Sequence, residues 1–144
     1  LIDYVADFKK TFFSLPAEDV AFPRSVNGLS EYADDNSIFK KGTPIHVKGA
    51  LVYNHFLREM NLTKRYQVIQ EGEKIKFIFL KEPNTIQSNV IAFPQGDIPE
   101  ELDLHKYIDY DTQFNKSFLE PLKIILDSIG WKTEQVSSLE DFFS

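Results

Sequence analysis

The chain has 144 residues, 42% of them hydrophobic, and carries a formal net charge of −6. This length can bury one substantial core but is too short for two comfortable domains, so we expect a single globular domain. No apolar run approaches the roughly 18–20 residues that a membrane span needs. The chain has no cysteine, which excludes disulfides and thiolate metal sites. We therefore expect a cytoplasmic protein with no membrane partner.

The hydrophobic pattern predicts alternating helical and extended segments along the chain. A helix is expected over residues 1–15, followed by a short strand and a loop over residues 17–43. A second helix should run from Pro44 to residue 60. A strand is expected within residues 71–84, and a shorter one within residues 89–96. The last element is a pair of helices over residues 103–130, with Gly130 as the stop. The predicted class is α+β, helix-rich, with a small antiparallel β element.

The charges are segregated along the chain. Residues 36–81 contain nine basic and three acidic side chains, a local charge of +6, whereas residues 84–144 have a local charge of −7. Only the basic middle is a plausible anion-binding surface. The alternative interpretation is an ordinary solvated face.

The basic residues follow consecutive predicted elements. Cations on a helix edge, a turn and one face of a strand would suit a cradle for a phosphate backbone, where they give affinity without reading sequence. The candidate DNA-binding residues are Lys40, Lys41, Lys48, Tyr53, Lys64, Arg65, Lys74 and Lys76.

Two aspartates raise the possibility of metal chemistry. Asp109 and Asp111 have the Asp-x-Asp spacing with which two-metal nucleotidyl transferases hold magnesium. Asp111 also directly precedes an amphipathic helical pattern, where an acidic side chain caps the helix, and we favour that interpretation. The three histidines have no ligand spacing. We therefore expect no catalytic residue and no metal site.

Several ordered segments resemble one family of enzymes. These are TPIHVKGALVYNHFL, VIQEGEKIKFIFLKEPN, NVIAFPQG, LHKYIDYDTQFNKSFLEPL and the terminal SLEDFF. Together they are similar to the C-terminal thumb region of family B replicative DNA polymerases from large tailed bacteriophages. The resemblance implies a largely helical domain that grips the primer–template duplex. It places the fingers and the palm, with its magnesium-binding aspartates, upstream, so that this chain needs no cofactor and is inactive alone. A start at Leu1 rather than Met is consistent with a piece cut from a longer protein.

The resemblance can be carried over at three motifs. The family's basic residue before a glycine corresponds to Lys48, and its tyrosine–asparagine pair corresponds to Tyr53 and Asn54. The glycine–glutamate–lysine turn ends at Lys74. Relatives often carry arginine at the position of Lys48, and lysine loses the bidentate fork of arginine.

The chain ends in SSLEDFFS, which concentrates apolar side chains among serines and acids. In the resembling family this end is a peptide that docks on the ring-shaped sliding clamp. One helical turn would bring Leu139, Phe142 and Phe143 together as a plug for an apolar pocket. The family's glutamine would fall at Val136, whereas this chain has Gln135. We expect a duplex-holding domain over residues 1–133 and a clamp-binding tail over residues 134–144; the alternative is a tail folded onto its own domain.

Two other classes of function remain open. The chain could be a free-standing interaction adaptor, in which the basic patch is incidental. It could also be a small metal-dependent enzyme that uses Asp109 and Asp111.

Overall fold

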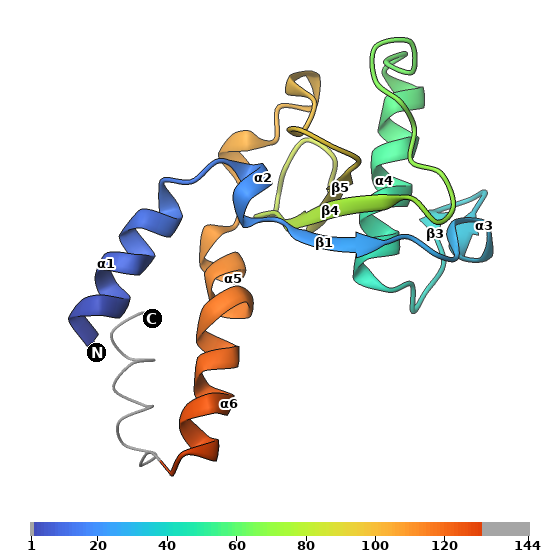
Figure 1. Ribbon diagram of the computed structural model, residues 1–144. Helices are drawn as coiled ribbons and strands as arrows, with labels where there is room; N and C mark the ends of the chain where they lie inside the picture. Colours follow the sequence, from blue (N-terminus) through green and yellow to red (C-terminus); the bar gives the residue numbers. More distant parts are fainter. Residues whose placement is uncertain (1, 131–144) are drawn as a thin grey trace. The chain divides into compact units, whose positions relative to one another are not determined.

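The structure is a computed structural model and describes residues 2–130 (Figure 1). The chain divides into two compact units. Residues 16–109 form the sheet unit, and residues 2–15 together with 110–130 form the described part of the helical unit.

A small antiparallel sheet is the centre of the sheet unit. Its strand order is β1-β4-β5, and Phe77 of the middle strand is in register with Phe22 on one side and Ala92 on the other. A two-stranded hairpin, β2 with β3, precedes the long helix α4. The elements are α2 (Ala17–Val20), β1 (Phe22–Ser25), α3 (Leu29–Tyr32), β2 (Ala33–Asp34), β3 (Ile38–Phe39), α4 (Ile45–Glu59), β4 (Lys74–Phe79), β5 (Val90–Phe93), η1 (Glu100–Leu102) and η2 (His105–Tyr107).

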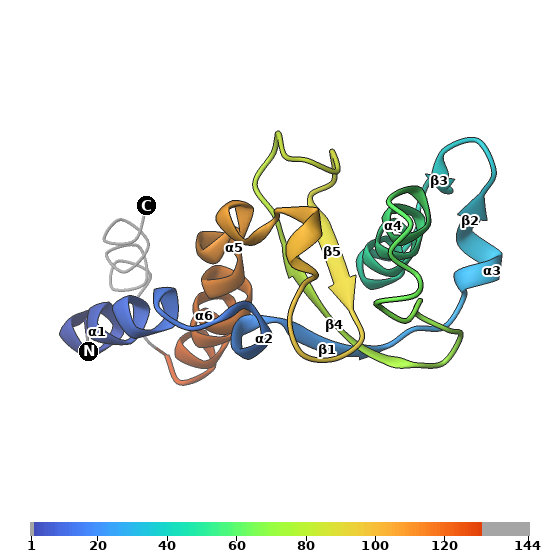
Figure 2. The same cartoon turned by 90° about the horizontal axis from the view of Figure 1, so that it is seen from above.

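Helix α4 packs chiefly against β5, and Figure 2 shows the two elements side by side. Gly49 makes this close approach possible. A Cβ atom at Gly49 would lie 2.9 Å from the Ala92 nitrogen and 3.3 Å from the Ala92 Cβ. The side chain of Ala92 therefore points towards α4, and so does that of its register partner Phe77.

Strand β4 is covered on both of its faces. Ile75 and Phe77 are buried on the α4 face, as their alternation predicts. Ile78 lies on the opposite face with Lys74 and Lys76, yet it is fully buried. The strand therefore does not have one buried and one solvent-exposed face, because other parts of the sheet unit, including α2, pack against its second side.

The helical unit consists of α1 (Ile2–Phe13) and a long bent helix made of α5 (Tyr110–Phe114), the π-helical η3 (Asn115–Leu119) and α6 (Glu120–Ser128). The rings of Phe8, Phe12, Phe114 and Phe118 form its aromatic cluster. The π-helical turn lies just before Pro121. Proline has no N–H and its ring collides with the carbonyl four residues earlier, so a widened turn lets the helix continue past it.

The α+β class with a small antiparallel sheet is confirmed, and so are the first two predicted helices, as α1 and α4, the strands β4 and β5, and the stop at Gly130, which has φ of 83°. The pair of helices predicted over residues 103–130 is instead one bent helix that begins at Tyr110. The end of the last helix carries exposed apolar side chains, because Ile125 and Ile129 are 56% and 65% exposed. Within residues 17–43 the pattern predicts only a strand and a loop, whereas the structure also has two short helices and a hairpin. The clamp-binding candidates Leu139, Phe142 and Phe143, and the boundary at residue 134, lie outside the described residues.

Candidate nucleic-acid interface

The N-terminal end of α4 brings together one group of the predicted cations. Lys40 and Lys41 are exposed in the turn before the helix. Lys48 is half-buried; its Nζ donates a hydrogen bond to Asn89 Oδ1 at 2.8 Å and lies 4.9 Å from the centre of the Phe39 ring. An ammonium group has three donors, so Lys48 is held in place while donors remain for an anion.

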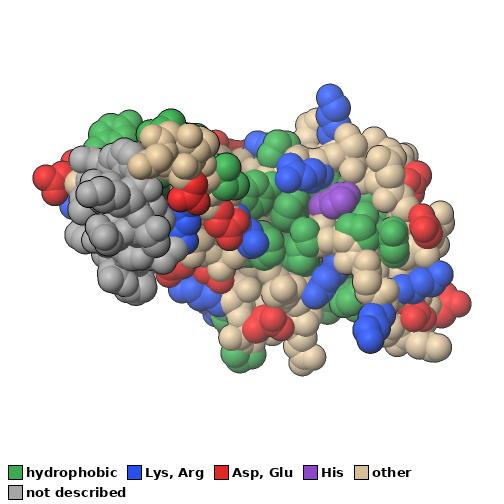
Figure 3. Space-filling model, turned by 90° about the horizontal axis from the view of Figure 1, so that it is seen from below, with side chains coloured by type: hydrophobic (Ala, Val, Ile, Leu, Met, Phe, Trp, Pro, Cys, Tyr) green, Lys and Arg blue, Asp and Glu red, His purple; other side chains and the backbone are tan. Residues whose placement is uncertain are grey.

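Two further residues, one on β1 and one in the first turn of α4, lie around Phe77 and were missed by the sequence analysis. The Arg24 guanidinium lies 5.6 Å from the centre of the Phe77 ring, and the His46 ring lies 6.4 Å from the same ring. Partial burial, together with the positive charge of Arg24, lowers the pKa of His46. His46 therefore offers a neutral ring rather than a charge at neutral pH. Figure 3 shows a face on which Lys and Arg side chains surround a histidine and exposed apolar side chains.

Lys74 and Lys76 do not share this sheet face. They alternate with Ile75 and Phe77, so they lie on the side of β4 opposite α4. Lys76 Nζ donates a hydrogen bond to the Glu18 carbonyl oxygen at 2.9 Å, which occupies part of its donor capacity. The single cradle of helix edge, turn and strand face is therefore not assembled on one face.

Lys64 and Arg65 lie beyond the other end of α4. The helix has 15 residues, a length of about 22 Å at ~1.5 Å per residue. Arg65 Nη1 lies 3.3 Å from Glu101 Oε2, which offsets part of its charge, whereas Lys64 is exposed. The predicted cations thus form separated groups at the two ends of α4 and on the far side of the sheet.

Tyr53 and Asn54 belong to the core. Tyr53 is only 1% exposed, and its hydroxyl donates to the Gln67 carbonyl oxygen at 3.3 Å. Burial raises the pKa of Tyr53 to about 12. Asn54 donates to the Ile69 carbonyl oxygen at 2.9 Å and accepts from the Ile69 N–H at 2.7 Å. The placement of Tyr53 on a DNA-facing surface is corrected: its ring is enclosed, and the pair fastens the following loop to α4.

Asp109 and Asp111 do not form a metal site with other described residues. Asp111 lies inside the first turn of α5, after Tyr110, so its predicted first-turn charge is confirmed but its predicted N-cap position is wrong; it is 3.6 Å from Lys9 Nζ. Within residues 2–130, no group of three or more His, Asp or Glu side chains is arranged to hold a metal ion. In the same part of the chain, none of the helices has the length and apolar character required to traverse a bilayer.

Comparison with known proteins finds similarity to two phage DNA polymerases. It is 29% identical to a DNA-directed DNA polymerase of Enterobacteria phage T4 over 144 residues, which is 98% of this chain and 16% of that protein. It is 30% identical to a DNA-directed DNA polymerase of Escherichia phage RB69 over 127 residues, 86% of this chain and 14% of that protein. The chain resembles a segment of phage DNA-directed DNA polymerases. No protein-family model matches it. The predicted resemblance to phage DNA polymerases is thereby confirmed.

As a polymerase-like segment, the chain spans only a small part of its relatives' length. It offers one group of cations at each end of α4. Arg24 is a further candidate, and Tyr53 is no longer one. Arg24 lies 12 residues before the basic window begins, so a charge count alone could not find it. The signal that could have found it is the strand pattern FPRS, which places Arg24 on the same face as Phe22.

Proposed function

We propose that this chain is the thumb of a family B phage DNA polymerase and holds the primer–template duplex during DNA replication in the host cytoplasm. The similarity of almost the whole chain to DNA-directed DNA polymerases supports the enzyme class. The oriented cation Lys48, in the same unit as the exposed side chains of Lys40, Lys41 and Arg24, is the observation that carries the duplex-holding role.

The two cation groups would act on the duplex as separate phosphate contacts. The group at the start of α4 and the group of Lys64 and Arg65 are separated by about the length of the helix, ~22 Å. A duplex carries one charge for every ~1.7 Å of its axis, so both groups can meet phosphates of one duplex at different positions. Such contacts position the duplex without reading its sequence.

The proposal also assigns roles to the rest of the polymerase and to the end of this chain. Fingers and palm of the same enzyme would be direct partners, and the palm would bind the magnesium ions of nucleotidyl transfer. The final residues would tether the enzyme to a sliding clamp, with Leu139, Phe142 and Phe143 as the apolar plug. This part of the proposal rests on sequence resemblance.

The decisive experiment is duplex binding by the 144-residue chain as a function of salt. We expect weak, sequence-independent binding, with a log–log slope of about −0.9 for each phosphate that the chain neutralises. Lys48→Ala and Arg24→Ala should each reduce the slope by about one unit. Lys48→Arg, which keeps the charge, should retain the slope, and so should Lys10→Ala on α1.

Two outcomes would contradict the duplex-holding role. The first is an affinity that does not change with salt, which would favour the adaptor instead. The second is equal slopes for Lys48→Ala, Arg24→Ala and the Lys10→Ala control in chains whose circular dichroism shows an intact fold. Neither outcome would alter the similarity to DNA polymerases.

A further inference from the structure

A second surface of the sheet unit has the opposite charge. A cavity of about 430 Å³ lies between the C-terminal half of α4 and residues 85–103. Its apolar lining includes Phe56, Met60, Ile86 and Leu102. We call it the acid-rimmed cavity, because Glu59, Glu101 and Asp103 also line it and no Lys or Arg of residues 2–130 does.

The apolar lining combines rigid and adaptable side chains. Ile86 and Leu102 are buried and form a fixed floor. Phe56 is half-buried and packs edge-on against the His55 ring, with 5.0 Å between the ring centres. Met60 is 43% exposed, and its flexible thioether can adjust to the shape of an incoming group. The volume is within the range of ordinary ligand pockets.

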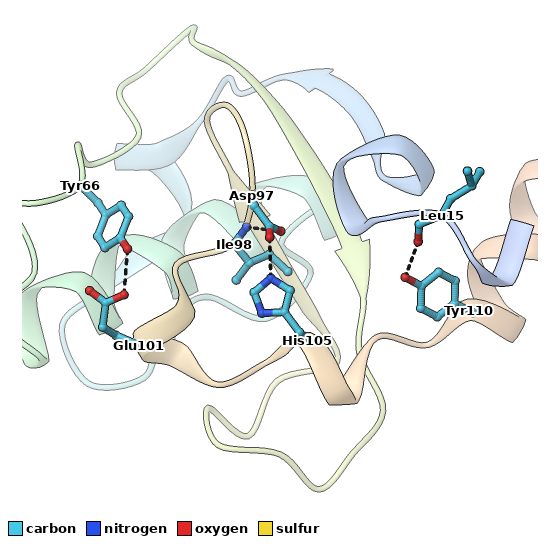
Figure 4. Close-up of polar contacts among 7 residues, drawn as sticks. All are labelled: Leu15, Tyr66, Asp97, Ile98, Glu101, His105 and Tyr110. Carbon is cyan, nitrogen blue, oxygen red and sulfur yellow. Dashed lines mark hydrogen bonds and ion pairs between the residues drawn. The ribbon is translucent and has the colours of Figure 1, made fainter.

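The acidic rim is only partly neutralised by its neighbours. Tyr66 donates a hydrogen bond to Glu101 Oε1 at 2.8 Å (Figure 4), and this bond lowers the pKa of Glu101 and keeps it ionised. Arg65 and Lys106 offset Glu101 and Asp103 at 3.3 and 3.2 Å. Glu59 is exposed and has no Lys or Arg partner among the described residues.

From this arrangement we propose that the acid-rimmed cavity docks a protein segment in which an aromatic or aliphatic side chain is flanked by lysine or arginine. The apolar side chain would enter between Phe56, Met60 and Ile86, where a buried anchor contributes most to affinity. A flanking cation would meet the Glu59 carboxylate at the rim. A phosphate ligand is disfavoured, because three carboxylates line the cavity. This site is therefore separate from the cations at the start of α4, and it shares only Arg65 with the second group, through the ion pair with Glu101.

The proposal can be tested with a defined probe and the full 144-residue chain. The peptide acetyl-KRWLKR-amide would be titrated into the ¹⁵N-labelled chain, and amide shifts followed by NMR. We expect saturable shifts confined to the end of α4 and residues 85–103, and none with acetyl-EDWLED-amide. Glu59→Gln should weaken binding about two- to fivefold, as expected for one exposed ion pair. Met60→Asp, at an exposed position, should weaken it further, whereas Asp35→Asn in the β2–β3 turn should have no effect.

Several results would overturn the proposal. One is no saturable shift at millimolar peptide in the folded chain. Others are equal binding of the acidic peptide, or an equal weakening by Glu59→Gln and Asp35→Asn, which would indicate attraction by overall charge alone. Shifts of the same cavity amides on addition of duplex DNA would assign the surface to nucleic acid instead. The amide spectrum of each variant reports its fold, so a disabled site is distinguished from an unfolded chain.

Discussion

Removing the side chain of Asn54 should strongly lower the stability of the sheet unit, although the side chain is small. In Asn54→Ala the N–H and the carbonyl of Ile69 are both left without their partner, and Ile69 is 2% exposed, so water does not readily replace it. Each buried group left unpaired costs about 1–3 kcal/mol. Alanine regains a few tenths of a kcal/mol, at most about 0.7, through its higher helix propensity. We expect a net decrease of about 1.5–5 kcal/mol in the free energy of unfolding.

The variant Asn54→Asp tests the two hydrogen bonds of Asn54 individually. The aspartate keeps an acceptor for the Ile69 N–H but places a second carboxylate oxygen against the Ile69 carbonyl. At neutral pH this variant should be at least as unstable as Asn54→Ala, because it adds a buried charge. Acidification protonates the new carboxyl and restores a donor, so part of the stability should be recovered relative to wild type at the same pH.

Urea unfolding followed by circular dichroism measures both effects. Asn36→Ala, an exposed asparagine in the turn between β2 and β3, is the matched control and should change the unfolding free energy by less than about 0.5 kcal/mol. If Asn54→Ala is no less stable than the Asn36→Ala control, the loop is not held by this amide and the reasoning fails.

Four further predictions concern packing, pH, the tail and catalysis. Gly49→Ala should cost about 1–3 kcal/mol in urea unfolding, because its Cβ would lie 2.9 Å from the Ala92 nitrogen; an equally stable variant would show that α4 shifts freely. The pKa of Tyr53 is raised to about 12, so the unfolded chain releases this proton first and stability should fall between pH 10 and 12, by at most about 1.4 kcal/mol per pH unit; a Tyr53→Phe variant with the same slope would refute this. Phe142→Ala should weaken clamp binding by roughly 2 kcal/mol or more, about thirtyfold; a deletion of residues 138–144 that lowers the melting temperature but leaves clamp binding intact would favour a folded-back tail. The isolated chain should incorporate no nucleotide with magnesium, and extension that disappears in Asp111→Ala would show that it is an enzyme.

The strongly periodic segments could be predicted because one pattern dominates each of them. Helices α1 and α4 show apolar residues at helical spacing, and β4 and β5 are short apolar runs between turns. Tyr53 could not be placed this way. It lies off the main apolar stripe, but α4 is packed by β5 on one side and by the loop of Gln67 and Ile69 on another. A helical pattern does not reveal a loop that returns to cover a second side.

The prediction that the cations form one surface was wrong for a different reason. Lys48, Lys74 and Lys76 are all on the predicted elements, but only the pairing of the strands decides which sheet face α4 covers. The contact of Gly49 with Ala92 fixes that face and puts the two strand lysines on the other side. Arg24 was missed because it lies on β1, which is far from β4 in the sequence and is brought beside it only by strand pairing.

The loop over residues 62–69 links the stability of the sheet unit to its proposed binding of DNA. Lys64 and Arg65 lie between Leu62, whose N–H donates to the Leu57 carbonyl at 2.8 Å, and Ile69, which Asn54 holds from two sides. Both ends of this cationic stretch are therefore tied to α4, the helix that carries Lys48. If the duplex meets both ends of α4, Asn54→Ala removes no charge but loosens the spacing between them. The folded variant should then keep the salt slope of wild type while its affinity falls, because ordering the loop is left to the binding step. An unchanged affinity would show that Lys64 and Arg65 take no part in binding.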